Sequence, residues 1–191
     1  MKYYLNTLWK GINSDIKEER EKADLQWKKN DEEYTKVFDK VKNKLPKKFL
    51  KIYMKEYGFH DYHIKDFEII NEKSGYKDPV TVKIIITNGI NTWDITYKKI
   101  KKIVVNYEQE PDLFPGMGRR FYGGFDDYGF DEFFEIDDKV LSQEILFASD
   151  ATILIHFEKI SIKKETDKEQ EVMASMKPTK KAWKKAVIPY F

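Results

Sequence analysis

The sequence predicts an α+β fold in which N-terminal helices precede a mainly antiparallel sheet of five or six strands. Two patterns support this prediction. Up to Gly58 the apolar residues recur every three or four positions, as on one face of an amphipathic helix. Beyond Gly58 apolar and polar residues alternate, which is typical of strands with one buried face. Strands and helices do not alternate along the chain, so the pattern favours antiparallel over parallel pairing.

The first expected helix begins near Ser14 and Asp15, which are both suitable N-cap residues. The polar pair Asn30 and Asp31 is a candidate interruption of this helix. Its apolar positions form one stripe, which consists of Ala23, Trp27, Tyr34, Val37, Phe38, Val41 and Leu45.

A second, shorter helix is expected over residues 47–57. Pro46 ends the first helix and suits the opening turn of the second. Gly58 is suited to the left-handed conformation that caps a helix C-terminus. The apolar positions of this helix are Phe49, Leu50, Tyr53, Met54 and Tyr57.

The expected strands follow Gly58. The stretches "DYHIKDFEII" and "VTVKIIITNG" open the sheet, and Asn88-Gly89 is a strong signal for a hairpin turn. The stretch "NTWDITYKKIKKIVVNY" supplies one or two further strands. A second hairpin is expected from "SQEILFAS" and "ATILIHFEKISI", with its turn near Ser149 and Asp150.

These elements form one expected α+β domain over residues 1–164, with a helical part at 1–58 and a sheet part at 59–164. A basic C-terminal tail follows at 165–191. Because the tail lacks the alternation of the sheet, we expect it to be weakly attached to the domain.

Charge is distributed unevenly along the chain. The net charge is +2, yet residues 1–60 carry an excess of +5 and residues 111–150 an excess of −7. Cysteine is absent, which excludes a disulfide framework, a thiol nucleophile and a cysteine-rich zinc site. We find no secretory signal and no apolar run of about 18 residues. We therefore expect a cytoplasmic protein without a membrane span, a metal ion or a cofactor.

Three passages resemble a known family: "MKYYLNTLW", "LPKKFLKIYMKEYGFHD" and "YGFDEFFEIDDKVLSQEILFASDATILIHFEKISI". The chain is similar to an uncharacterised family of intracellular proteins from Gram-positive bacteria that is known as a domain of unknown function. The resemblance implies N-terminal helices, a Phe-His-Asp passage into the sheet and a closing hairpin, but no catalytic residues. This chain departs from the family in its shorter helical region, its longer glycine-rich segment and its added tail.

The glycine-rich segment "PGMGRRFYGGFDDYGFDEFFEIDD" does not match a nucleotide-binding motif. Gly116 and Gly118 are followed by Phe121 where a dinucleotide fingerprint needs its third glycine, and there is no Gly-Lys-Ser/Thr sequence. His60 and His63 would point to opposite faces of a strand, which is poor geometry for a metal site. We therefore expect no nucleotide and no metal site.

We instead interpret the segment from Leu113 to Tyr128 as a docking surface with aromatic residues at its centre. Its acidic edge would attract a basic partner. A loop that folds back over one sheet face is the alternative interpretation. The candidate contact residues are Phe114, Met117, Arg119, Arg120, Phe121, Tyr122, Phe125, Asp126, Asp127 and Tyr128. The acids of the expected edge are Asp126, Asp127, Asp131, Glu132, Glu135, Asp137 and Asp138.

The expected function is that of a non-enzymatic, intracellular protein-binding module. A small protein that neutralises a basic toxin or enzyme, as an immunity protein does, would need such a surface. The alternative is an accessory nucleic-acid-binding protein that uses its basic N-terminal and C-terminal segments. Nucleic acid is the less favoured partner because the acids near the aromatic residues would repel phosphates.

Overall fold

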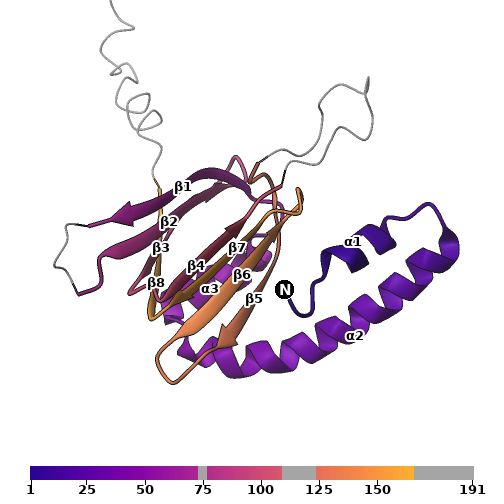
Figure 1. Cartoon of the computed structure of the whole chain (residues 1–191), viewed down its shortest axis with the longest axis horizontal. Coiled ribbons are helices and arrows are strands. Elements are labelled where there is room, and N and C mark those ends of the chain that lie inside the picture. The colour runs from indigo at the N-terminus through magenta and orange to yellow at the C-terminus, as the bar shows by residue number, and fades with distance from the viewer. Residues whose placement is uncertain (73–76, 109–123, 166–191) are drawn as a thin grey trace, which may run out of the picture.

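A computed structural model of the protein describes residues 1–72, 77–108 and 124–165. It confirms the α+β fold, with helices first and antiparallel strands after them (Figure 1). The helices are α1 (Asn6–Ile12), α2 (Lys17–Val41) and α3 (Lys47–Lys55), with short 3₁₀ turns at Lys42–Lys44 and Tyr57–Phe59. The strands are β1 (His63–Asn71), β2 (Val80–Thr87), β3 (Thr92–Lys98), β4 (Lys102–Asn106), β5 (Tyr128–Glu135), β6 (Leu141–Phe147), β7 (Thr152–Phe157) and β8 (Lys159–Lys164).

The strands of the described part of the chain form two four-stranded sheets. One sheet has the order β1-β2-β3-β8 and the other has the order β4-β7-β6-β5. The expected hairpins are present, since β2 pairs with β3 and β6 pairs with β7 in antiparallel register. The sequence predicted five or six strands, whereas the structure has eight. Two long strands each change sheet and become two, namely β3 with β4 and β7 with β8. The remaining strand, β5, lies in the acidic stretch that was not counted as a strand.

The chain changes sheet at two places. One lies between β3 and β4, and the other lies at Glu158, between β7 and β8. Lys99 has a φ of 56°, so the backbone turns sharply there. The ammonium groups of Lys99 and Lys101 each lie 2.8 Å from the carboxylate of Glu158. These hydrogen bonds lower the pKa of Glu158 to about 2. Lys99 and Lys101 therefore stabilise the corner at which the two sheets meet.

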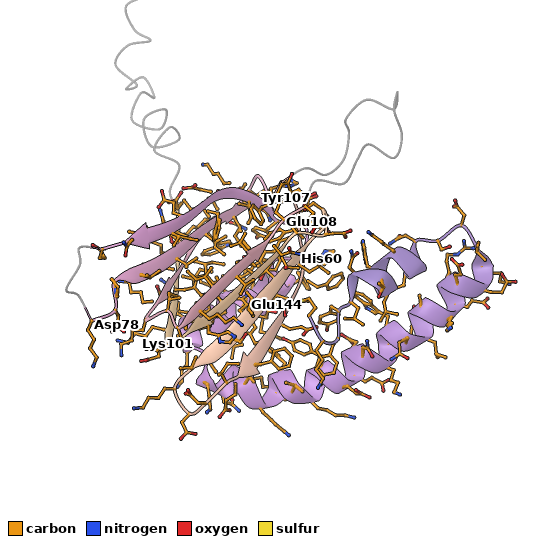
Figure 2. The ribbon with its side chains drawn as sticks, viewed as in Figure 1. His60, Asp78, Lys101, Tyr107, Glu108 and Glu144 are labelled. Atoms are coloured by element: carbon orange, nitrogen blue, oxygen red, sulfur yellow. The ribbon has the colours of Figure 1, made fainter. Side chains whose placement is uncertain are left out.

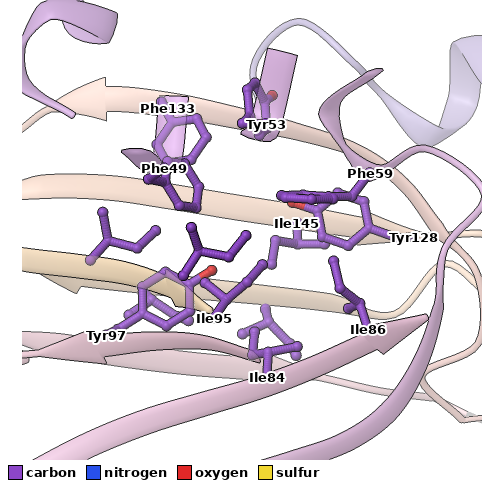
Figure 3. Close-up of a cluster of buried hydrophobic side chains, with 14 of the residues drawn as sticks. Phe49, Tyr53, Phe59, Ile84, Ile86, Ile95, Tyr97, Tyr128, Phe133 and Ile145 are labelled. Atoms are coloured by element: carbon purple, nitrogen blue, oxygen red, sulfur yellow. The ribbon is translucent and has the colours of Figure 1, made fainter. Parts of the chain in front are cut away.

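The core lies between the two sheets and beneath α3. Phe49 and Tyr53 of α3 pack on Phe133 of β5, with ring centroids 6.0 and 5.6 Å away (Figure 3). Ile84 and Ile95 approach the same interior from the other sheet and are 0% and 1% exposed. Helix α3 therefore closes the space between the sheets. The predicted apolar positions Phe49, Leu50 and Tyr53 pack there. The prediction was wrong for Met54 and Tyr57, which are 59% and 88% exposed, because the helix ends at Lys55.

Helix α2 is continuous through the pair that we expected to interrupt it. Asn30 donates from its side chain to the carbonyl of Tyr3 at 2.8 Å, and Asp31 accepts from the hydroxyl of Tyr4 at 2.7 Å. The interruption was therefore wrong, because these polar residues bind the N-terminal segment from within a regular helix. The N-cap residue is Ile16 rather than Ser14 or Asp15.

The N-terminal segment is also bound to the outer face of β5. The carboxylate of Glu132 accepts hydrogen bonds from the backbone amides of Lys2, Tyr3 and Tyr4 at 2.8, 2.6 and 2.7 Å. Glu132 is 0% exposed. Its cross-strand neighbour on β6, Glu144, lies 2.6 Å from the N-terminal ammonium group. The two acids thus fix the start of the chain against the sheet.

Aromatic residues fill the space around these polar contacts. Tyr4 lies 5.1 Å from Phe130 and 5.2 Å from Tyr34 between ring centroids, and Trp27 lies 4.7 Å from Phe130. The Tyr34 hydroxyl accepts a hydrogen bond from the amide of Phe133 at 2.6 Å. Helix α2 and the N-terminal segment therefore cover the outer face of β5, as Figure 1 shows.

We predict that Glu132→Gln lowers the free energy of unfolding by about 2–3 kcal/mol. The substitution keeps the volume but removes the charge, and it places an amide donor where backbone donors must be accepted. Glu135→Gln is the matched control on the same strand. Glu135 forms an ion pair with Lys44, which is 36% exposed. Loss of this exposed ion pair should lower the free energy of unfolding by less than about 1 kcal/mol. Urea unfolding of both variants measures the difference, and equal losses would contradict the role of Glu132.

Candidate functional site

The start of β5 is joined to the start of β1, although the two strands belong to different sheets. The amide of Tyr128 donates to the carbonyl of Tyr62 at 2.7 Å, and the amide of Asp61 donates to the carbonyl of Tyr128 at 2.9 Å. The amide of Ile64 donates to the carbonyl of Asp126 at 3.3 Å. These bonds fix the backbone of the chain as it enters β5.

Four aromatic side chains meet next to this seam, and we call them the docking cluster: Phe67, Tyr107, Phe125 and Phe147. The ring centroid of Phe125 lies 5.8 Å from that of Phe67, 5.9 Å from that of Tyr107 and 5.4 Å from that of Phe147. Phe147 is buried, Phe67 and Phe125 are half-buried, and Tyr107 is 43% exposed. The docking cluster therefore runs from the core to the surface.

The docking cluster adjoins an exposed strand edge. Among the described residues, β4 is the edge of its sheet and pairs only with β7. Its residues Val104 and Val105 are 42% and 41% exposed. Tyr107 follows β4 directly, at the end of the molecule away from Lys101 (Figure 2). An edge strand with exposed apolar side chains can pair with an extended segment of another protein.

Acidic groups lie beside the docking cluster. Asp126 accepts a hydrogen bond from the amide of Ser149 at 3.0 Å, whereas its second carboxylate oxygen is buried without a hydrogen-bond partner in the described part of the chain. Burial raises the pKa of Asp126. The carboxylate of Asp127 contacts the imidazole Nδ1 of His63. Glu108, next to Tyr107, is exposed.

The structure places four of the predicted contact residues. Phe125, Asp126 and Asp127 are partly exposed around the docking cluster. The prediction for Tyr128 was wrong, because this residue is 0% exposed. It is the first residue of β5, and its side chain points into the core, where its ring lies 6.3 Å from Phe59. The remaining predicted residues lie outside the described ranges and stay predictions: Phe114, Met117, Arg119, Arg120, Phe121 and Tyr122.

We expected the acidic run to form one surface, but it does not. Asp131 is 5% exposed and Glu132 is 0% exposed. Successive residues of a strand point to opposite faces, so Asp131 faces the interior and Glu132 faces α2. The exposed acids of this run are Glu135, Asp137 and Asp138, and they lie at the end of β5 and in the turn after it. Among the described residues, Asp126 and Asp127 adjoin Phe125 and Glu108 adjoins Tyr107, so these three acids lie beside the docking cluster.

The polar network around Asp131 was not predicted from the sequence. Tyr53 donates from its hydroxyl to one carboxylate oxygen at 2.6 Å, and Gln143 donates from its side-chain amide to the other at 2.6 Å. Gln143 also donates to the hydroxyl of Tyr128 at 2.9 Å and accepts from that of Tyr97 at 2.7 Å. Because both oxygens of Asp131 bind protein donors, this network supports the interior. A Gln and an Asp at inward positions of apolar strands were the signal in the sequence.

The described residues offer no arrangement that would hold a metal ion. Within residues 1–72, 77–108 and 124–165, no three His, Asp or Glu side chains are grouped for this purpose. His60 lies 3.0 Å from Asp61, and His156 is half-buried on β7. No described helix is both long enough and apolar enough to cross a membrane.

Comparison with known proteins adds little to this geometry. No protein-family model matches the chain, and no curated protein matches it. One similar solved structure is an uncharacterised protein from Neisseria gonorrhoeae, with a TM-score of 0.34 and 19% sequence identity. The match covers 55% of this chain and 92% of that one. The likeness to a domain of unknown function stays a prediction from sequence.

The buried carboxylate of Asp131 predicts a specific dependence of stability on pH. Burial raises its pKa to about 6, above the value of about 3.9 in an unfolded chain. The folded state therefore binds this proton more tightly. The resulting stabilisation is complete below about pH 4 and is lost as the pH rises through about 6. The loss amounts to about 2–3 kcal/mol.

Asp131→Asn keeps the size of the side chain and removes this titration. Urea unfolding at pH 4, 5, 6 and 7 should show that the free energy of unfolding of the natural protein falls relative to that of the variant. Taking the difference cancels the other carboxylates, which titrate in both proteins. Parallel pH profiles for the two proteins would contradict the raised pKa of Asp131.

Proposed function

We propose that the protein is a non-enzymatic protein-binding module whose partner docks on the docking cluster and the adjoining edge of β4. The observation that carries this proposal is the exposed ring of Tyr107, supported by Phe125 and followed back along the chain by Val105 and Val104. Aromatic side chains at the centre of a surface patch are typical of binding hot spots. The backbone of an edge strand offers hydrogen bonds to an extended segment.

The partner is a protein with a basic segment. Asp126, Asp127 and Glu108 lie beside the docking cluster and give this end of the molecule negative charge. An acidic edge increases the rate at which a basic partner arrives, and the apolar contacts then hold it. An immunity-like protein that neutralises a basic toxin or enzyme would bind in this way.

The same proposal places the protein in the cytoplasm. The chain has no cysteine, and a domain without disulfides is suited to a reducing compartment. Within residues 1–72, 77–108 and 124–165, the fold is stabilised by two packed sheets, a helical layer and buried hydrogen bonds instead of disulfides. These elements leave the docking cluster as a fixed platform.

We expect Tyr107→Ala to weaken binding of the native partner at least tenfold, as truncation of a hot-spot residue does. The partner is first isolated from extracts of the native host by affinity capture and identified by mass spectrometry. Its dissociation constant is then measured for the natural protein and for the variant. Leu25→Ala is the matched control, because Leu25 is 73% exposed on α2, away from the docking cluster.

The control should bind like the natural protein, and both variants should keep their melting temperatures. Equal binding by the Tyr107 and Leu25 variants would show that the partner docks elsewhere. Failure to capture any protein, together with turnover of a substrate by the purified chain, would exclude the non-enzymatic proposal.

A further inference from the structure

A cleft of about 410 Å³ lies at the other end of β4, beside the corner where the strands change sheet. Residues of β3, β8 and the Lys42–Lys44 turn line it. Figure 2 shows Lys101, which binds Glu158 in this corner, far from Tyr107 of the docking cluster. The cleft is therefore separate from the surface on which the proposed function rests.

Two lysines face each other at the rim of this cleft. Lys98 of β3 and Lys159 of β8 are directly opposite in the antiparallel ladder, and both are exposed. Like charges in opposing positions of two strands destabilise the pair. Neither lysine has a carboxylate within 4.0 Å among the residues that the structure describes. The sheet thus maintains a repulsion at this position.

The same sheet neutralises its lysines elsewhere. Four residues back along β3, Asp94 is directly opposite Lys163, whose ammonium group lies 3.0 Å from the carboxylate. A second lysine, Lys83, lies 3.5 Å from the same carboxylate. Asp94 balances those cations on the face that also carries Lys98 and Lys159. Lys98 and Lys159 therefore differ from the pair of Asp94 and Lys163 on the same two strands, in which the charges are opposite.

The remaining lining of the cleft combines apolar and hydroxyl groups. Leu141, Phe157 and Ile160 are 6%, 1% and 4% exposed and belong to the core beneath the cleft, whereas Pro46 is an exposed apolar residue of the lining. Thr96 and Ser161 add hydroxyl groups on the lysine side. The one acid in the lining, Glu158, is already bonded to two other lysines. Clefts of this size and mixed lining suit small organic molecules.

We infer that this cleft binds a small organic anion in which a carboxylate, sulfonate or phosphate group is attached to an apolar body. The anionic group lies between Lys98 and Lys159 and relieves their repulsion, because a negative charge stabilises both cations. The apolar body lies against Pro46 and the methylene groups of the lining lysines, where it removes apolar surface from water. Both parts of the ligand are needed, so an inorganic anion alone binds weakly.

The probe for this inference is 8-anilinonaphthalene-1-sulfonate, a fluorescent aromatic sulfonate. Titration of the full chain should give saturable binding of about one molecule per chain at this site. The double variant Lys98→Gln/Lys159→Gln should bind it at least tenfold more weakly. Lys102→Gln is the matched control, since Lys102 is an exposed strand lysine that does not line the cleft, and it should change the affinity less than twofold.

Stability provides a second measurement. Removing two opposing like charges should leave the melting temperature of the double variant equal to or above that of the natural protein. The inference is overturned if the double variant binds the probe as tightly as the natural protein. It is also overturned if uncharged N-phenyl-1-naphthylamine binds as tightly as the sulfonate, or if the double variant melts at a lower temperature.

Discussion

Strand β5 carries two neighbouring buried carboxylates that point to opposite faces, and both layers of the molecule are organised around them. On the inner face, Asp131 accepts hydrogen bonds from Tyr53 of α3 and Gln143 of β6. On the outer face, Glu132 accepts the amides of residues 2–4. A buried carboxylate is costly unless donors satisfy it. The helices and the N-terminal segment are therefore held where those donors must be.

This arrangement leaves two surfaces at opposite ends of β4. The docking cluster lies where β4 ends and β5 begins, and the backbone bonds of the seam fix it in place. The lysine-rimmed cleft lies where β3 turns into β4, next to the hydrogen bonds of Glu158. Both surfaces carry charge and apolar contact together. They differ in sign, so they suit a basic protein segment and a small anion respectively.

Local patterns in the sequence predicted the elements that depend on local physics. The stripe from Ala23 to Leu45 is the buried face of α2 and the turn after it, and Asn88-Gly89 forms the turn of a hairpin. Long-range placement was not predictable in this way. The acids of β5 looked like one exposed run, because nothing local shows that α2 covers its outer face. The burial of Tyr128 also depends on an irregularity that no local pattern shows, because the register shifts between Tyr128 and Phe130. Gly129 lies at this shift, where a Cβ atom would approach the carbonyl of Leu146 to 2.9 Å.

Hydrogen exchange followed by nuclear magnetic resonance tests the central role of Glu132 most directly. The backbone amides of Tyr3 and Tyr4 lie near the start of the chain, where amides ordinarily exchange fast. Because the buried carboxylate accepts both, we predict that they exchange as slowly as the amide of Phe133, which is bonded to Tyr34 of α2. Rates for Tyr3 and Tyr4 that match those of an unstructured peptide would contradict this account.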